Sequence, residues 1–429
     1  MPAPFGKKKE NTVTAARGGG GHIFAFEARF LRWAGAHLIP IGFVGITLLS
    51  LLMRYTFRDF ASGDASVFLL PWYEQIRAAG GIAALKEQVG DYNILYQFVI
   101  ALFTYLPIRP LYAYKLFSVV FDYLLAAAVS RIVYRLSGPE SRGRRALTAY
   151  TVVICSPLVM FNSALWAQCD AVYTFFCVTA LYCLLGEDRR YLAAFILYGV
   201  AVTFKLQAVF ILPLFLYVYF TKREFSALYF LIVPLMMLLL SLPGLLMGRS
   251  ILEPFTIYFG QVSEYQRIGF NFPTFWFLFR NAVYVEYDEL YYLIRYAAVA
   301  LTVVVLGMHM LLWYQKKIPL TLRSGLCMAF LCAYTCVLLL PAMHERYGFL
   351  CEILAVPVLF FYPRTLAMFL PLYLVSVNTY AFYLFGRDKD LTALAAVYLI
   401  VYAAYAYYLT RKLLSEAEHS GTDAAERAI

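Results

Sequence analysis

The stretch YNILYQFVIALFTYLPI, residues 92–108, decides the membrane topology of this chain, because it is apolar and about long enough to cross a membrane. The rest of the chain has the same character. Of its 429 residues, 62% are hydrophobic and only 14% are charged, and the mean hydropathy is +0.68. A soluble domain of this size could not bury so much apolar surface. The chain is therefore predicted to be a polytopic membrane protein.

Twelve further apolar runs have the length and composition of membrane spans. Such runs must form helices, because backbone polar groups cannot stay unpaired in lipid. Strands of a membrane barrel would alternate in polarity, and these runs do not. The predicted fold is an all-α bundle of about twelve transmembrane helices, at residues 36–53, 113–134, 146–164, 170–185, 191–204, 207–220, 225–246, 289–314, 324–342, 347–362, 365–384 and 391–411.

The position of 92–108 sets the side of the membrane on which each loop lies. If this stretch spans, the arginine-rich loop at 134–145 falls outside the cell. If it lies along the outer surface or dips into it, that loop falls inside. The second arrangement also places the other basic turns inside, at 187–190, 221–224, 315–317 and 411–412. The positive-inside rule favours this arrangement, with both termini cytoplasmic.

This topology defines one membrane domain, residues 36–411, between two cytoplasmic tails. The tail at 1–35 is basic and glycine-rich and is expected to be flexible, and the tail at 412–429 is polar. A large first outer loop at 54–112 would hold juxtamembrane amphipathic helices, and a second outer loop covers 247–288. The cytoplasmic loops are short and basic, whereas the outer turns are rich in varied polar groups. The functional face is therefore expected to be extracytoplasmic.

The net charge of +10 and the eight cysteines have simple explanations in a membrane protein. Lys and Arg collect in the predicted cytoplasmic loops, so membrane lipids are expected partners and nucleic acid is not. The cysteines lie almost entirely in apolar runs without CxxC spacing, which suggests neither a zinc site nor a disulfide framework. No metal motif occurs, so no cofactor is expected, although a divalent cation shared by Asp64 and Asp91 is conceivable. Nothing in the sequence specifies an oligomeric state.

Ionisable residues at membrane depth are costly, which makes them the strongest functional signal here. Lys205 interrupts the apolar stretch 191–220, with Gln207 beside it. Lys205 is either a cation for an anionic ligand or a lysine that reaches the membrane surface from a helix end. The HERY run at 344–347 suits phosphate recognition through Arg346. An ion pair between that arginine and its neighbouring glutamate, or another loop, is the structural alternative.

Asp64, in the segment SGDASVFLLPWYEQI, is the candidate catalytic base. A hydroxyl that attacks an activated sugar needs a carboxylate within hydrogen-bond reach, and one prominent acid among several cations fits that chemistry better than a paired-carboxylate hydrolase. The alternative is that Asp64 caps a helix beginning near Ser66. Asp59 and Asp91 are possible second acids.

The WAQCD turn at 166–170 offers an indole, an amide and a carboxylate for substrate binding. Asp170 could equally cap the helix that follows it.

In chain order, these segments resemble the GT-C superfamily of glycosyltransferases, and within it the bacterial relatives of the second mannosyltransferase of GPI-anchor synthesis. The resemblance runs from about residue 54 to residue 350. It rests on SGDASVFLLPWYEQI, DYNILYQF, KLFSVVFDYLLA, NSALWAQCDAVYTFF, FKLQAVFILP, GFNFPTFWF and MHERYGF.

The resemblance implies a polyprenyl-phosphate sugar donor, a glycan or lipid acceptor, and transfer on the outer leaflet with inversion. The first-loop acid of the family falls on Asp64. Donor phosphate binding falls on Lys205, Arg346 and His344. Other substrate contacts are expected from Trp166, Gln168, Asp170, Gln207, Glu345, Tyr347, Asn271, Trp72 and Tyr92.

Two positions depart from the family pattern, and two other functions compete with it. Leu206 stands where proline is more usual, and Gly348 stands where an aromatic residue is commoner. A transporter or lipid flippase would show inverted repeats and mid-membrane charges, of which the chain has few. A polysaccharide polymerase or ligase would place its largest outer loop late in the chain.

Overall fold

The computed structural model describes residues 24–264, 267–279, 289–386 and 391–426. Across these residues the secondary structure is helical and no strand occurs, as the sequence predicts. The first part of the chain forms α1 (Ala25–Ala36), α2 (Leu38–Thr56), η1 (Ala65–Leu69), α3 (Leu70–Ala78), η2 (Gly81–Lys86), α4 (Ile94–Phe103), α5 (Pro110–Arg135), α6 (Arg142–Ile154), α7 (Pro157–Met160) and η3 (Phe161–Leu165). The middle part forms α8 (Asp170–Leu185), α9 (Tyr191–Phe204), η4 (Leu206–Ile211), α10 (Leu212–Lys222), η5 (Ala227–Leu231), α11 (Ile232–Leu240), α12 (Leu242–Leu246) and α13 (Glu253–Glu264). The last part forms η6 (Phe275–Leu278), α15 (Glu289–Gln315), α16 (Leu322–Leu339), α17 (Phe349–Phe361), η7 (Pro363–Thr365), α18 (Leu366–Phe385) and α19 (Leu391–Glu426).

Six of the described helices are long and apolar enough to cross a membrane: α2, α5, α15, α16, α18 with η7, and α19. A seventh candidate is α6 together with α7 and η3, which meet at 46°. The bend lies at Pro157, because proline cannot continue a helix from the residue before it. The other expected ranges hold helices of 10–17 residues. The chain is therefore a multi-helix membrane protein, and twelve crossings and the side of each terminus stay predictions.

Two expected ranges differ in detail from the structure. Within 92–108, only Ile94–Phe103 is helical; ten residues rise about 15 Å, half the thickness of a bilayer's apolar core. Within 1–35, expected to be flexible, residues from Ala25 onward form α1. The parts of the two predicted tails at 1–23 and 427–429, of the predicted second outer loop at 265–266 and 280–288, and of the turn at 387–390 lie outside the described residues.

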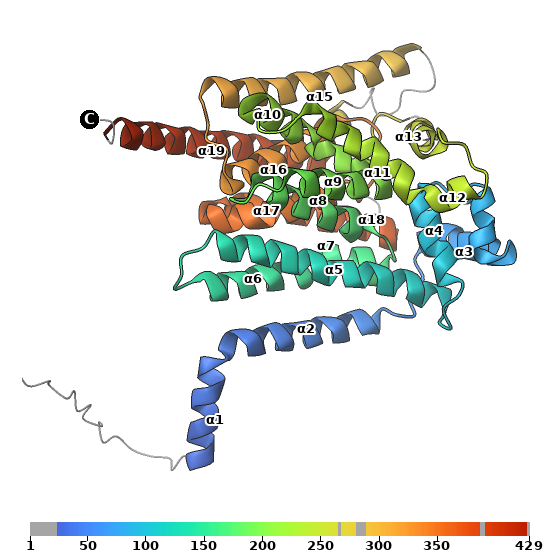
Figure 1. Ribbon diagram of the computed structural model, residues 1–429, viewed down its shortest axis with the longest axis horizontal. Coiled ribbons are helices and arrows are strands. Elements are labelled where there is room, and N and C mark those ends of the chain that lie inside the picture. The colour runs from blue at the N-terminus through green and yellow to red at the C-terminus, as the bar shows by residue number, and fades with distance from the viewer. Residues whose placement is uncertain (1–23, 265–266, 280–288, 387–390, 427–429) are drawn as a thin grey trace, which may run out of the picture.

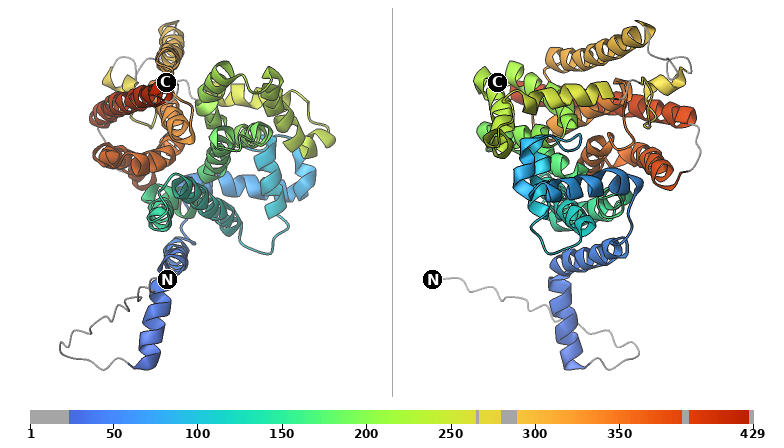
Figure 2. Two further views of the ribbon diagram at one scale, coloured as in Figure 1. Left: turned by 60° about the vertical axis from the view of Figure 1, so that its left-hand side comes forward. Right: turned by 90° about the vertical axis from the view of Figure 1, so that its right-hand side faces the viewer.

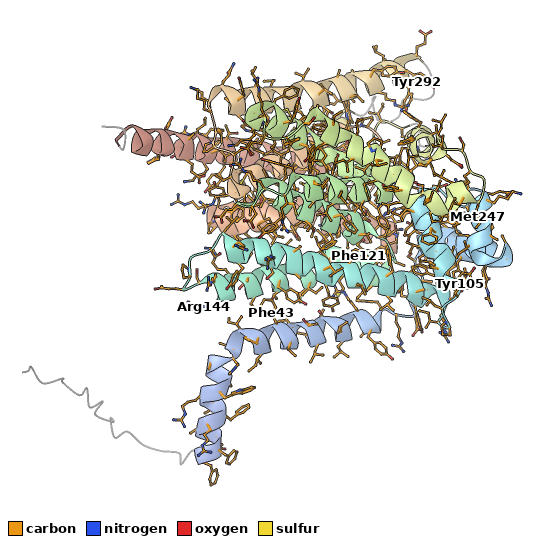
Figure 3. All side chains as sticks on the ribbon, viewed as in Figure 1. Phe43, Tyr105, Phe121, Arg144, Met247 and Tyr292 are labelled. Carbon is orange, nitrogen blue, oxygen red and sulfur yellow. The ribbon has the colours of Figure 1, made fainter. Side chains whose placement is uncertain are left out.

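The long helices run roughly side by side, and short elements gather at one end of the bundle (Figure 1). α3, α4, α12 and α13 lie at that end, and the C-terminal end of α19 lies at the other. Figure 3 shows Arg144, in the first turn of α6, at the end opposite Tyr105 and Met247. The core centres on α16, in which 94% of the residues are buried. In the peripheral α2 only 11% of the residues are buried (Figure 2).

Although α2 is peripheral, its C-terminal end is fastened to the bundle. Arg54 donates hydrogen bonds to the Asp122 carboxylate from Nε at 3.1 Å and from Nη2 at 3.0 Å. Lys115 Nζ donates to the carbonyls of Phe57, at 2.5 Å, and Phe60, at 2.7 Å. These contacts fix the start of the segment that carries Asp64.

Candidate active site

A single cavity at the α3–α4 end of the bundle collects most of the residues predicted for the site. Six separate parts of the chain form its wall: the first loop, the turn after η3, the break after α9, helix α13, the turn before α17, and the end of α18. Its lining residues are Asp64, Phe68, Leu69, Trp72, Asp91, Tyr92, Gln168, Phe204, Lys205, Gln207, Gln261, His344, Glu345, Arg346, Tyr347 and Tyr383.

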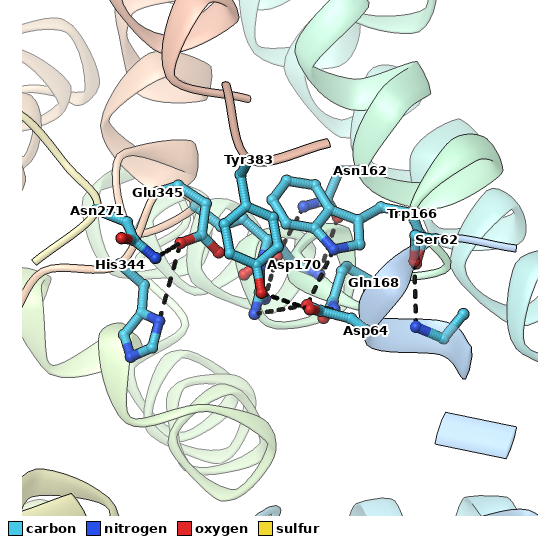
Figure 4. Close-up of polar contacts among 12 residues, drawn as sticks. Ser62, Asp64, Asn162, Trp166, Gln168, Asp170, Asn271, His344, Glu345 and Tyr383 are labelled. Carbon is cyan, nitrogen blue, oxygen red and sulfur yellow. Dashed lines mark hydrogen bonds and ion pairs between the residues drawn. The ribbon is translucent and has the colours of Figure 1, made fainter. Parts of the chain in front are cut away.

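Asp64 lies in this wall with its carboxylate held by three donors (Figure 4). Trp166 Nε1 and Gln168 Nε2 each donate to Oδ2 at 2.9 Å, and the Tyr383 hydroxyl donates to Oδ1 at 2.6 Å. Asp64 makes no capping hydrogen bond, because Ser62 Oγ accepts from the Ala65 N–H instead. The helix-cap interpretation of Asp64 is therefore wrong. An ionised carboxylate has about four acceptor positions, so three protein donors leave room for one from a ligand.

The turn after η3 is shaped so that two nearby side chains reach Asp64. Ala167, between Trp166 and Gln168, has φ +64°, which is uncommon for a residue other than glycine. Backbone hydrogen bonds hold the turn, from Gln168 N to Asn162 O at 2.8 Å and from Ala167 N to Ser163 O at 3.0 Å. Strained backbone of this kind concentrates at functional sites, where surrounding contacts enforce it.

Behind Asp64, Asp170 is fully buried and shared by two cations. It accepts from Lys205 Nζ and, at 3.3 Å, from Arg346 Nη1, while Asn162 Nδ2 donates to it at 2.7 Å. The N-cap position of α8 is occupied by Cys169, and the Asp170 carboxylate accepts from Asn162, Lys205 and Arg346 instead, so the capping interpretation of Asp170 is wrong. Lys205 is buried, so it does not reach the membrane surface from a helix end as the structural alternative proposed. The ion pair proposed as the alternative for Arg346 is present, with Glu345 and with Asp170 as partners.

The helical path breaks at Lys205, whose backbone is extended, with φ −156° and ψ 131°. The break turns its side chain toward Asp170 and places Gln207 in the cavity wall. Gln207 Oε1 is buried and accepts no hydrogen bond from the described residues. A buried acceptor of this kind is costly unless a ligand supplies the donor.

The HERY turn forms the opposite wall. Glu345 accepts from Arg346 Nε at 3.3 Å and from Asn271 Nδ2 at 3.0 Å. Burial, followed by the positive charges of Arg346 and Lys205, lowers the pKa of His344 to about 3. His344 is therefore neutral at physiological pH, so it can offer an N–H to phosphate but adds no charge.

Gly348, which departs from the family pattern, has a steric reason to be glycine. A Cβ atom there would lie 2.5 Å from Glu352 Oε1 and 3.0 Å from the Phe272 ring. The buried Glu352 carboxylate occupies the space that a larger residue would need.

The remaining predicted residues divide between the cavity and the surface. Trp72, Tyr92 and Tyr347 line the cavity, and the Tyr92 hydroxyl donates to Gln168 Oε1 at 3.2 Å. Asp91 lines it at an exposed position. Asp59 lies outside the lining and pairs with Tyr112 at 2.5 Å, Arg58 at 3.2 Å and Arg109 at 3.5 Å.

Tyr383 is a site residue that the sequence does not reveal. Besides its hydrogen bond to Asp64, its ring stacks on Trp166, with ring centres 5.0 Å apart. Near the end of a membrane helix a tyrosine is usually assigned to the interfacial aromatic belt. Only the packing of α18 against the Trp166 turn brings it to the site.

Among the described residues, no group of three His, Cys, Asp or Glu side chains is arranged as metal ligands. The cavity wall combines the hydrogen-bonded carboxylate of Asp64 with the acids Asp91 and Glu345 and with the cations Lys205 and Arg346.

Comparison with known proteins gives one match at the level of a family. The model of "Glycosyltransferase family 87" matches residues 92–341, more than half of the chain. No curated protein matches. The matched residues include the Trp166 turn and Lys205 and end just before His344. The chain belongs to glycosyltransferase family 87 and is a membrane glycosyltransferase.

Proposed function

We propose that the protein transfers a hexose, with mannose as the default, from a polyprenyl-phosphate donor to a lipid-linked or cell-envelope glycan. Asp64 is the general base and transfer takes place on the outer leaflet of the cell membrane. The observation that carries the proposal is the position of Asp64, held by three donors in the wall of a cavity that also contains Lys205 and Arg346. The outer side is inferred from the basic turns at the other end of the bundle.

The reaction is a single displacement. The acceptor hydroxyl donates its hydrogen bond to the remaining acceptor position of Asp64, and its oxygen attacks the anomeric carbon. The bond from that carbon to the phosphate oxygen breaks, and the hydroxyl proton passes to the Asp64 carboxylate. One displacement at the anomeric carbon inverts its configuration. The polyprenyl phosphate leaves with the bonding electron pair, and it needs no strong acid because phosphate is already a good leaving group.

The two buried cations, Lys205 and Arg346, would neutralise the charge of the donor phosphate. Lys205 and Arg346 both contact Asp170, which holds their side chains at the inner wall of the cavity. Arg346 has five N–H donors. Its Nη2 atom lies 3.9 Å from Asp64 Oδ2, so the guanidinium group is next to the proposed base. Charge that develops on the leaving phosphate is stabilised by cations that are already in place. Because side chains supply this charge, we propose that no divalent cation is needed and that EDTA leaves transfer unchanged.

The decisive experiment measures transfer of labelled mannose from polyprenyl-phosphate mannose to membrane glycans or lipids, in vesicles containing wild type, Asp64→Asn or Asp59→Asn. Asparagine can keep the hydrogen bonds from Trp166 and Gln168 but cannot accept a proton, so we expect a fall of about 10²–10⁴-fold. Asp59→Asn removes an exposed carboxylate from the same segment and should retain transfer. Equal transfer by wild type and Asp64→Asn would overturn Asp64 as the base. Absence of transfer by wild type would overturn mannose as the sugar.

A further inference from the structure

α1 presents apolar side chains without burying them in the bundle. Phe26, Phe30 and Trp33 follow a four-then-three spacing and so share one face of the helix, with exposed fractions of 69%, 60% and 52%. Helix α1 turns sharply away from α2 at His37 and extends beyond the bundle in every view (Figures 1 and 2). Exposure of such an aromatic face to water would be unfavourable.

The junction with α2 places α1 at a membrane surface. α2 is a candidate span of 19 residues, which rise about 28 Å, close to the thickness of the apolar core of a bilayer. Its outward leucines are exposed, as expected for a helix that faces lipid. A helix that meets such a span at one end and leaves its direction must begin at the membrane–water boundary.

The charged residues of α1 fit a boundary position. Arg29 and Arg32 are three residues apart and both exposed, and Arg29, three residues after Phe26 and four before Trp33, borders the aromatic face, whereas Arg32 lies farther from it. Arginines at and beyond the border of an aromatic face can reach the lipid headgroups while the aromatic rings enter the membrane, as in helices that lie in the plane of a membrane. The turn that follows α15, at the same end of the bundle, is also basic, with Lys316 and Lys317 (Figure 1).

We propose that α1 is an interfacial helix that lies on an anionic phospholipid surface, at the membrane face opposite the Asp64 cavity. The aromatic face enters the boundary between headgroups and acyl chains, and the two arginines contact lipid phosphates. The partner is therefore the lipid surface itself. This inference does not depend on the proposed reaction.

The first test measures the fluorescence of Trp33 in the full chain reconstituted in phosphatidylcholine vesicles with or without phosphatidylglycerol. The Trp33 contribution is the difference between wild type and Trp33→Phe. We expect it to be quenched by lipids brominated close to the headgroup and protected from aqueous iodide. The same difference for Trp313→Phe, a buried tryptophan, controls for general effects. Quenching by iodide and not by brominated lipid would overturn the proposal.

The second test removes the two arginines of α1 with Arg29→Gln/Arg32→Gln. Each arginine near an anionic surface is worth about 1 kcal/mol, or about a fivefold change in the ratio of docked to detached α1. The double variant should lose the added quenching that phosphatidylglycerol gives to wild type. Lys316→Gln/Lys317→Gln removes the same charge at the same end of the bundle and should keep it. An unchanged response in the Arg29→Gln/Arg32→Gln variant would overturn the lipid charge preference.

Discussion

Asp170→Asn is the substitution that most directly tests how the site handles charge. Asp170 is fully buried and contacts both Lys205 and Arg346. Asparagine has nearly the same size and can still bond to Asn162, but it leaves the two cations without their shared counter-ion. Breaking a buried ion pair costs about 3–5 kcal/mol, and Arg346 keeps its contact with Glu345, so we expect the lower value. At about 2 °C per kcal/mol, the unfolding midpoint should fall by about 6 °C.

The same variant should bind a polyprenyl phosphate more tightly than wild type. In wild type the phosphate competes with Asp170 for the cations, whereas in the variant it restores the missing negative charge. If the ligand recovers half of the lost 3 kcal/mol, affinity rises about tenfold. The assay is thermal unfolding of purified protein in detergent, titrated with polyprenyl phosphate. Asp188→Asn, at an exposed position in the turn after α8, is the matched control and should change neither midpoint nor affinity.

Two results would refute this reasoning at different points. A variant as stable as wild type would mean that Asp170 does not hold the cations in the folded protein. A destabilised variant whose midpoint does not respond more strongly to polyprenyl phosphate would mean that Lys205 and Arg346 do not bind the phosphate.

Two further predictions concern residues around Asp64. Tyr383→Phe keeps the ring on Trp166 but loses the hydrogen bond to the Asp64 carboxylate; we expect kcat to fall about tenfold with KM unchanged in the transfer assay, and an equal kcat would contradict a positioning role. The pKa of His344 is about 3 in the folded protein and near 6.5 when unfolded, so acidification from pH 6.5 protonates only the unfolded chain and stability falls. At pH 4.5 the free energy of unfolding is expected to be about 3 kcal/mol lower than at pH 7 because of this residue, and His344→Gln should remove that loss. Unfolding midpoints of the two proteins at pH 7 and pH 4.5 measure it. Equal acid sensitivity of the two proteins would contradict the low pKa of His344.

The sequence by itself determined the class of the molecule. In lipid, the backbone polar groups of these apolar runs can be hydrogen-bonded only within helices. Composition and hydropathy were therefore enough to predict an all-helical membrane protein. Lys205 in an apolar stretch and the HERY run also predicted part of the candidate site, because ionisable residues at membrane depth are costly, and the structure places Lys205 and Arg346 in the wall of one cavity. The need for a carboxylate base and the resemblance to GT-C glycosyltransferases selected Asp64 among several acids, and the structure places it in the cavity.

Only the tertiary structure decided which partners these residues have. Trp166 and Asp64 are 102 residues apart, and Tyr383 and Asp64 are 319 apart, so no local pattern could predict their hydrogen bonds. Helix capping stayed an alternative for both Asp64 and Asp170, since the sequence shows a carboxylate at a helix start but not the direction of its side chain. Their contacts follow from packing: the end of α9 and the turn before α17 meet Asp170 at the start of α8, and α18 brings Tyr383 against Asp64.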